Sequence, residues 1–217
     1  RSDNGSNQDF RTLKYSNAGG VLWSKFYNGP ANQNDRPVKI AIDPSNNVYI
    51  AGEVDVDNSS LIDYDFALLK YNSSGTIQWA RIEGSNAESD SPSDLAIDPV
   101  GDVIVTGKAD FNTNLLITNN DFMTVKYNTA GTLQWKKFHS GTLSGGSDIA
   151  SSIIIDGAAN CYVAGGSENT TTQKNNTNLV QLDNNLVNTL GFVTDITSCL
   201  LYTSPSPRDR TRSRMPY

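Results

Sequence analysis

The chain repeats itself three times at a step of 56 residues. The seven residues from Asp9 to Tyr15 return at 65–71 and again at 121–127, and a Trp recurs at the same step. A repeat of this length is typical of propellers and solenoids, which are built from stacked units, and not of a domain with one core. The repeat therefore constrains the fold class strongly and says little about a ligand.

One unit, residues 37–84, contains four stretches with strand character. They are rich in β-branched and aromatic residues, and turn-forming Asp, Asn, Pro and Gly separate them. The first three are apolar on both faces, which is typical of strands between two sheets. The fourth alternates around Trp79, which is typical of a strand with one buried face. We expect strands over 38–42, 48–52, 66–71 and 76–82.

Four antiparallel strands joined by tight turns describe one blade of a β-propeller. A β-solenoid coil is usually shorter than this unit, and a leucine-rich repeat has a different spacing of Leu and Asn. No segment shows a sustained helical period with caps. The sequence therefore predicts an all-β fold of the propeller type.

The repeat divides residues 9–190 into about 3.5 blades. Closed propellers have typically 4–8 blades, so we expect an open arc of a larger ring, with two unpaired blade faces. The last blade is degraded, because Gln181-Leu182-Asp183 replaces the Lys-Tyr-Asn of the other units. The expected boundaries are 1–8 for a cut N-terminal end, 9–28 for a half blade, 37–84 and 93–140 for whole blades, 149–190 for the degraded blade, and 191–198 without assignment.

Residues 199–217 resemble the translation of a transposase-type sequencing adapter. The run from Cys199 to Asp209 matches one reading frame of such an adapter, and 213–216 match its continuation in the same frame. We therefore interpret this segment as a non-native tail and leave it out of the fold. The tail carries four Arg and one Asp, so without it the formal net charge changes from −6 to −9.

The acidic balance argues against a nucleic-acid partner, since phosphate binding needs clustered Lys and Arg. No apolar run is long enough to span a membrane. Outside the tail the sole cysteine is Cys161, which falls where Val48 and Val103 fall in the other units. We expect it to be a small core residue, and no disulfide or cysteine metal site follows from it.

The unit resembles the SBBP-type β-propeller repeats of secreted bacterial proteins. The residues that carry the resemblance are 65–79, with the sequence DFALLKYNSSGTIQW, and 96–107, with the sequence AIDPVGDVIVTG. The resemblance extends over 9–190. The chain is similar in particular to large surface proteins of Bacteroidetes-like bacteria. It implies an extracellular or cell-surface scaffold with no assigned catalysis and no cofactor.

A second resemblance concerns the hairpin at 128–135, with the sequence NTAGTLQW. It is similar to the Gly-to-Trp hairpin of quinoprotein-like propeller repeats, in which the Trp docks between neighbouring blades. The resemblance implies the same packing role for Trp23, Trp79 and Trp135. The cofactor-binding residues of that family have no counterpart that can be placed here.

Residue types that recur in every unit are better explained as scaffold than as a site, because a catalytic site needs each group once. We expect recurrent Asp to bond turn backbone and recurrent Lys to lie along an exposed or blade-edge face. The recurrent positions are Asp9, Asp65 and Asp121, Lys14, Lys70 and Lys126, Gly52, Gly107 and Gly165, and the turn residues Asp43, Asp98 and Asp156.

Two features invite a chemical interpretation. Asp55, Asp57 and Asp63 lie in an acidic loop whose first positions alternate as in a Ca²⁺ loop, but Ser60 stands where Gly is needed and Phe66 where the bidentate Glu belongs. We expect a solvated loop, with a calcium site as the alternative. His139 is the sole histidine and is expected to be an exposed edge residue, so no catalytic set and no metal set can be assigned.

The sequence favours a non-enzymatic scaffold or binding module for protein or glycan, at the cell surface or outside the cell. Its candidate surfaces are the longer polar loops 53–64, 108–120 and 166–176. The alternatives are a piece of a glycosidase-like or quinoprotein-like propeller enzyme, whose active site lies outside this chain, and a spacer for an appended domain.

Overall fold

The computed structural model describes residues 7–31, 33–57, 63–85, 89–110, 119–141, 145–168 and 176–182. The described residues form strands joined by turns and loops, and they contain no helix, so none that could cross a membrane. The all-β prediction is confirmed. The strands are β1 (Phe10–Tyr15), β2 (Val21–Tyr27), β3 (Arg36–Ile42), β4 (Val48–Asp55), β5 (Tyr64–Tyr71), β6 (Ile77–Glu83), β7 (Ser91–Ile97), β8 (Val103–Asp110), β9 (Asn120–Tyr127), β10 (Leu133–His139), β11 (Asp148–Ile155), β12 (Cys161–Ser167) and β13 (Asn176–Leu182).

The described strands form four antiparallel sheets, each a meander of consecutive strands. The sheets are β1–β2, β3–β6, β7–β10 and β11–β13. Two of them have the four strands expected of a unit, and the first contains the two strands expected of 9–28. A fourth strand in the last unit would fall on residues outside the described ranges, as do 191–198 and the tail 199–217.

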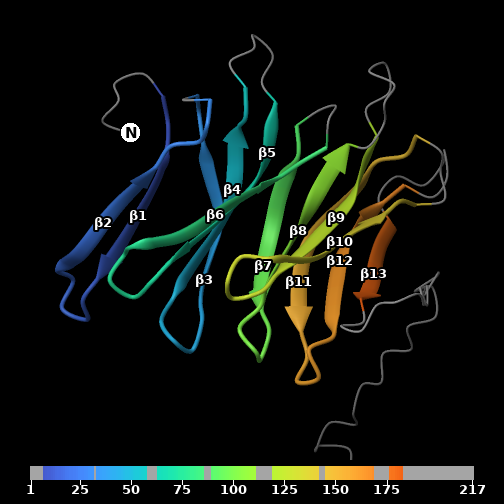
Figure 1. Ribbon diagram of the computed structural model, residues 1–217. Helices are drawn as coiled ribbons and strands as arrows, with labels where there is room; N and C mark the ends of the chain where they lie inside the picture. Colours follow the sequence, from blue (N-terminus) through green and yellow to red (C-terminus); the bar gives the residue numbers. More distant parts are fainter. Residues whose placement is uncertain are drawn as a thin grey trace, which may run out of the picture.

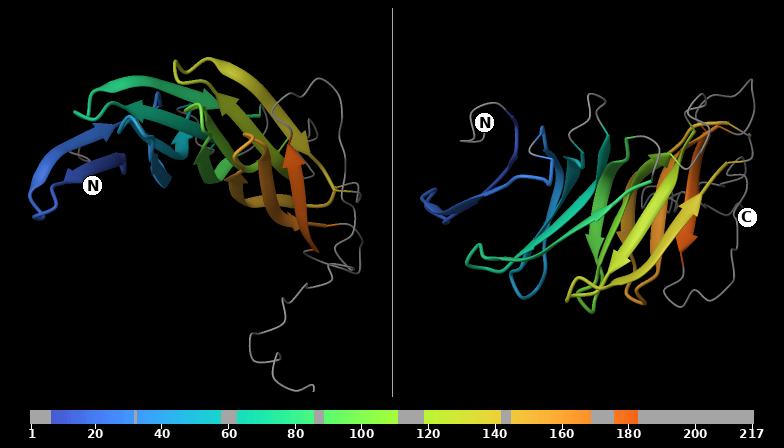
Figure 2. Two further views of the ribbon diagram at one scale, coloured as in Figure 1. Left: turned by 90° about the horizontal axis from the view of Figure 1, so that it is seen from below. Right: turned by 45° about the horizontal axis from the view of Figure 1, so that its top comes forward.

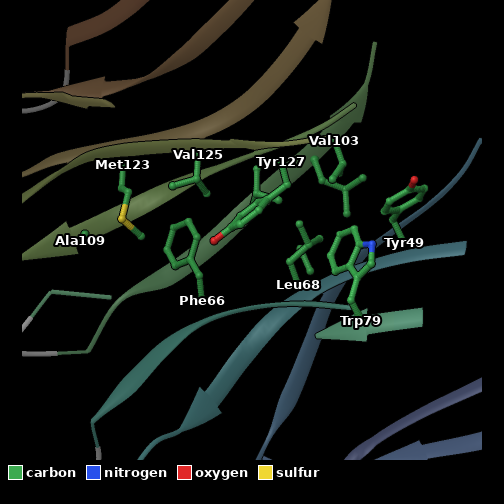
Figure 3. Close-up of a cluster of buried hydrophobic side chains, with 12 residues drawn as sticks. Tyr49, Phe66, Leu68, Trp79, Val103, Ala109, Met123, Val125 and Tyr127 are labelled. Carbon is green, nitrogen blue, oxygen red and sulfur yellow. The ribbon is translucent and has the colours of Figure 1, made fainter. Parts of the chain in front are cut away.

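The four sheets stand face to face in chain order and follow a curve (Figures 1 and 2). Three apolar clusters fill the spaces between consecutive sheets, so the core of this molecule lies between its repeats. The central cluster takes Tyr49, Leu68 and Trp79 from one sheet and Val105 and Tyr127 from the next (Figure 3). No sheet could bury both of its faces alone, which explains why the repeated units stack.

The middle strands of the two complete units are covered on both faces, as expected. All eight residues of β4 are buried, and so are the last six of β5. Cys161 on β12 is also buried, and burial raises the pKa of its thiol to about 11. The prediction of a core cysteine is confirmed.

Strand β3 departs from the prediction that the first strand of a unit is covered on both faces. Ile40 and Ile42 are 57% and 58% exposed, whereas Leu95, which takes the place of Ile40 on β7, is 5% exposed. The reason is the width of the neighbouring sheet. A four-stranded sheet covers β7, but the described part of the first sheet has two strands, and these lie over β4 and β5.

The recurrent turn before the second strand is built by an aspartate side chain. Asp43 Oδ1 accepts from Asn47 N (2.8 Å), Asp98 Oδ1 from Asp102 N (2.9 Å) and Asp156 Oδ1 from Asn160 N (2.9 Å). The side chain thus replaces backbone partners in a tight reversal, and the prediction for these three residues is confirmed.

Candidate functional site

The recurrent Trp and Lys link each sheet to the turn of the sheet that follows. Trp23 Nε1 and Lys14 Nζ both donate to the carbonyl of Ser73, at 3.2 and 3.1 Å. Trp79 Nε1 and Lys70 Nζ donate in the same way to the carbonyl of Thr129, at 3.2 and 2.8 Å. The predicted docking of the Trp between units is confirmed at these two junctions.

The expectation of exposed or edge lysines is wrong for two of the three. Lys70 is 8% exposed and Lys126 is 4% exposed. Burying an ammonium requires partners, and Lys126 has Asp98 at 2.8 Å and Asp102 at 3.3 Å. These ion pairs raise the pKa of Lys126 against the opposing effect of its burial.

The Trp sites depend on glycine in the receiving turn. Gly75 and Gly131 have φ of +79° and +78°, a region that costs an L-residue free energy. A Cβ on either residue would also come within 2.8 Å of the ring of Trp23 or Trp79. Glycine is required at these positions both for the turn and for the ring that rests on it.

The recurrent glycines of the second strand receive a phenylalanine from the preceding sheet. A Cβ at Gly107 would lie 2.7 Å from Phe66 and one at Gly165 would lie 2.6 Å from Phe122. Phe10 would meet a Cβ at Gly52 in the same way. The three glycines therefore serve packing between units.

Asp9, Asp65 and Asp121 do not fit their predicted role as turn formers. The Oδ1 atom of each is buried without a hydrogen-bond partner among the described residues. The turn backbone is bonded by another recurrent set, which the sequence analysis did not single out. Asp35 accepts from Gly29 N, Asp90 from Ser85 N and Asp148 from Gly141 N.

These two sets of aspartates place like charges close together at every junction. Burial, followed by the charge of Asp90, raises the pKa of Asp65 to about 7. Burial also raises the pKa of Asp90 to about 6 and that of Asp35 to about 6, in spite of the backbone hydrogen bonds that each accepts. Desolvation and like-charge repulsion both favour the protonated acid, so Asp65, Asp90 and Asp35 bind a proton at higher pH than a free aspartate does.

The structure brings the three calcium candidates near one another. Asp57 N donates to Asp55 Oδ1 (3.3 Å), and Val56 N donates to the carbonyl of Asp63 (3.4 Å). Burial and the charges of Asp57 and Asp55 raise the pKa of Asp63. The described residues nevertheless contain no set of three His, Cys, Asp or Glu side chains placed to hold a metal ion, and 58–62 of this loop lie outside them.

His139 is not the exposed edge residue that was predicted. It is half-buried at the end of β10, and its ring packs against Phe122 with centroids 5.6 Å apart. Burial lowers its pKa. His139 stands opposite Phe122 in the ladder of β10 and β9, which brings the two rings together.

One set of polar residues crosses three sheets without repeating. Lys39 Nζ lies 2.9 Å from Asp94 Oδ1, and Asp94 Oδ2 accepts from Ser152 Oγ at 3.0 Å and from Ile153 N at 3.1 Å. We call Lys39, Asp94 and Ser152 the inner polar line. Its members come from β3, β7 and β11, which follow one another at one edge of the stacked sheets (Figure 1).

A β-bulge precedes each member of the inner polar line. The ladders skip one residue between Pro37 and Lys39, between Pro92 and Asp94, and between Ala150 and Ser152. A bulge redirects the next side chain and is common beside functional sites. The three residues therefore occupy equivalent positions in three successive units. The position carries a cation in the first of these units, an anion in the second and a hydroxyl in the third.

The inner polar line offers charged donors and acceptors at the surface. The Lys39 side chain is 49% exposed and Ser152 is exposed, whereas Asp94 is 7% exposed. Burial would raise the pKa of Asp94, but the hydrogen bonds from Lys39, Ile153 N and Ser152 outweigh it and lower that pKa. The line thus holds a buried carboxylate between an exposed ammonium and an exposed hydroxyl.

Sequence reasoning missed this line because it looked for residues that recur. The signal was present in the alignment of the units, where Lys39, Asp94 and Ser152 differ in type at a matched place on the first strand. Positions that vary within a repeated scaffold are the ones that packing leaves free.

Comparisons with known proteins identify no family. The sequence matches no protein-family model, and no curated protein matches it. Two solved structures share its strand arrangement in part, each at 13% sequence identity. One is a protein of unknown function from Bacteroides caccae, with 84% of this chain and 52% of that chain covered at a TM-score of 0.45. The other is described as a putative gluconolactonase, with coverages of 74% and 49% and a TM-score of 0.39.

The chain therefore spans about half the length of these two structures. The prediction that the chain is not an enzyme does not stand, since one of the two solved structures that the chain resembles is described as a putative gluconolactonase. Shared architecture does not transfer a reaction, and no reaction is assigned to this chain.

Proposed function

We propose that this chain forms about 3.5 blades of a larger β-propeller of the SBBP type, which acts at the cell surface or outside the cell as a scaffold that binds protein or glycan. Four-stranded antiparallel sheets stacked in a curve support the propeller. The acidic composition is in keeping with a partner other than nucleic acid. No part of the proposal depends on whether the ring also carries a catalytic site.

The observation that carries the binding role is the inner polar line. Recurrent residues at the junctions are used for packing, so they are not available to a ligand. Lys39 and Ser152 are exposed, differ in type and lie on the first strands β3 and β11, on either side of Asp94 on β7. The ammonium of Lys39 and the hydroxyl of Ser152, both held by the buried carboxylate of Asp94, can bond the hydroxyl and carbonyl groups of a glycan or a peptide.

Binding to immobilised glycans and to extracellular matrix proteins tests this proposal, followed by titration of any ligand found. Lys39→Ala should weaken binding about tenfold or more, since a charge-assisted hydrogen bond is lost. Lys137→Ala is the matched control, because Lys137 is also a partly exposed lysine but lies on the outer strand β10. Equal affinity of the two variants, or no bound ligand in either panel, contradicts the proposal.

A further inference from the structure

Two side-chain oxygens at the entry to the third strand lack partners in both complete units. Asp63 Oδ1 and Asp65 Oδ1, at the start of β5, are buried without a hydrogen-bond partner among the described residues. The same holds for Asn119 Oδ1 and Asp121 Oδ1 at the start of β9. The two pairs are 56 residues apart, so the structure repeats one feature, which we call the Asx-x-Asp motif.

The two oxygens of a motif lie on the same side of the chain. Side chains at i and i+2 of an extended segment point to one face of the sheet. Val56 N donates to the carbonyl of Asp63 at 3.4 Å, so the pairing of β4 with β5 extends to that residue. The Cα atoms of such a pair are about 7 Å apart. Two side chains that lean toward each other over this span can reach one ion, whose oxygen ligands lie at about 2.4 Å.

Burial makes an unpartnered carboxylate costly at these positions. Asp121 is 6% exposed, and although Ser140 donates to its carboxylate, Oδ1 receives no bond. None of the ion pairs among the described residues includes Asp121. Charges buried in proteins are paired with an opposite charge or coordinate a metal ion. A buried oxygen without a donor therefore indicates that a ligand supplies its partner.

The charges around both motifs are mainly negative. Asp148 and Asp110 are the charged groups that act on Asp121. At Asp65 the charges of two other aspartates outweigh the attraction of Lys136. Each motif therefore lies in a negative potential, which attracts a small cation.

We propose that the Asx-x-Asp motif binds one calcium ion in each complete unit, through the side-chain oxygens at both of its ends. Calcium takes carboxylate and amide oxygens together with backbone carbonyls and water, so its site does not need three carboxylates. Residues 7–9 carry the same motif, and Asp9 Oδ1 is also buried without a partner among the described residues. The ion supplies the positive charge that the carboxylates of each motif lack.

Isothermal titration calorimetry of the full chain with calcium, after treatment with a chelator, counts the ions. We expect at least one ion for each complete unit, and Asn119→Ser with Asp121→Ser should reduce the number by one. Asp102→Ser is the matched control, because Asp102 precedes β8 at the end far from this motif, and it should leave the number unchanged. The proposal is overturned if the unsubstituted chain binds no calcium at about 10 mM, above the dissociation constants of extracellular calcium modules. It is also overturned if the double variant binds as many ions as the control.

Stability measured with and without calcium separates a metal ion from a proton as the group that neutralises these carboxylates. In a calcium-free buffer at pH 8, Asp65→Asn should raise the urea midpoint, because one of two like charges is removed. Calcium at about 10 mM should raise the midpoint of the unsubstituted chain more than that of the variant, since an ion that binds only the folded chain stabilises it. A calcium-induced shift that is equal in the two proteins, or absent from both, rejects the metal site.

Discussion

At the scale of single residues, the junction aspartates decide how this chain responds to pH. Asp65 lies buried near Asp90, and its pKa is raised from 3.8 to about 7, by burial first and then by the charge of Asp90. A raised carboxyl pKa means that the folded chain binds the proton more tightly than the unfolded chain. Its contribution to stability is full below pH 3.8 and is lost as the pH rises through about 7.

Asp65→Asn should therefore raise the free energy of unfolding at pH 8 by about 1–2 kcal/mol, because the amide removes the like charge and the cost of a buried carboxylate. The gain should disappear near pH 4. Urea unfolding at both pH values measures it. An equal effect of Asp65→Asn at both pH values would show that Asp65 is ionised throughout.

The indole N–H of the recurrent Trp provides a second comparison at this scale. Trp79 donates to Thr129, whereas Trp135 Nε1 is buried without a hydrogen-bond partner among the described residues. Trp79→Phe should cost about 1 kcal/mol more in unfolding free energy than Trp135→Phe, since only the first loses a hydrogen bond. If a denaturant titration shows the same loss of unfolding free energy for both variants, the whole effect comes from burial of the ring and the hydrogen bond contributes nothing.

At the scale of the structural element, each hairpin turn is fitted to the sheet before it. Gly131→Ala should destabilise the fold by about 2 kcal/mol or more, because the alanine meets both a φ of +78° and the ring of Trp79. Gly157→Ala is the control, since a Cβ there has no neighbour within 4 Å, and it should change stability by less than about 0.5 kcal/mol. Thermal unfolding of both variants checks the difference.

The strands and turns were predictable from the sequence because the same residue types recur at matched positions in each unit. The Asp43 turn and the glycine turns were visible as recurring types, and the structure confirms them. The alternation predicted around Trp79 is wrong, because Ile77 is 44% exposed and the residues that follow Trp79 on β6 are all partly buried. The exposure of β3 and the burial of Lys70 were not predictable, because both depend on what the neighbouring sheet provides. The inner polar line was not predicted for the same reason, because its ion pair and hydrogen bond join residues of different units that lie 55 to 58 positions apart in the sequence.

At the scale of the whole molecule, stability should be lowest at the first sheet. Each four-stranded sheet packs on two neighbours, whereas β1–β2 contacts one and has an open edge. In a linear array the stability of a unit is the sum of its own folding and its contacts with adjacent units. Position along the arc should therefore decide which strands open first.

Hydrogen exchange measured strand by strand should show β8 and β9 as the most protected elements and β1–β2 as the least, with the opening of β1–β2 several kcal/mol below global unfolding. Uniform protection across all four sheets would mean that the array unfolds as one unit.

The contact of a Trp with the glycine turn of the following sheet has a consequence for how such a chain can change in length. At the two junctions where the structure describes both sides, a unit brings a ring for its successor and a turn for its predecessor. Gaining or losing a whole unit by recombination between matched points therefore joins surfaces that already fit. A break inside a unit would separate a ring from its turn, so the gene for such a protein can grow and shrink in steps of one repeat.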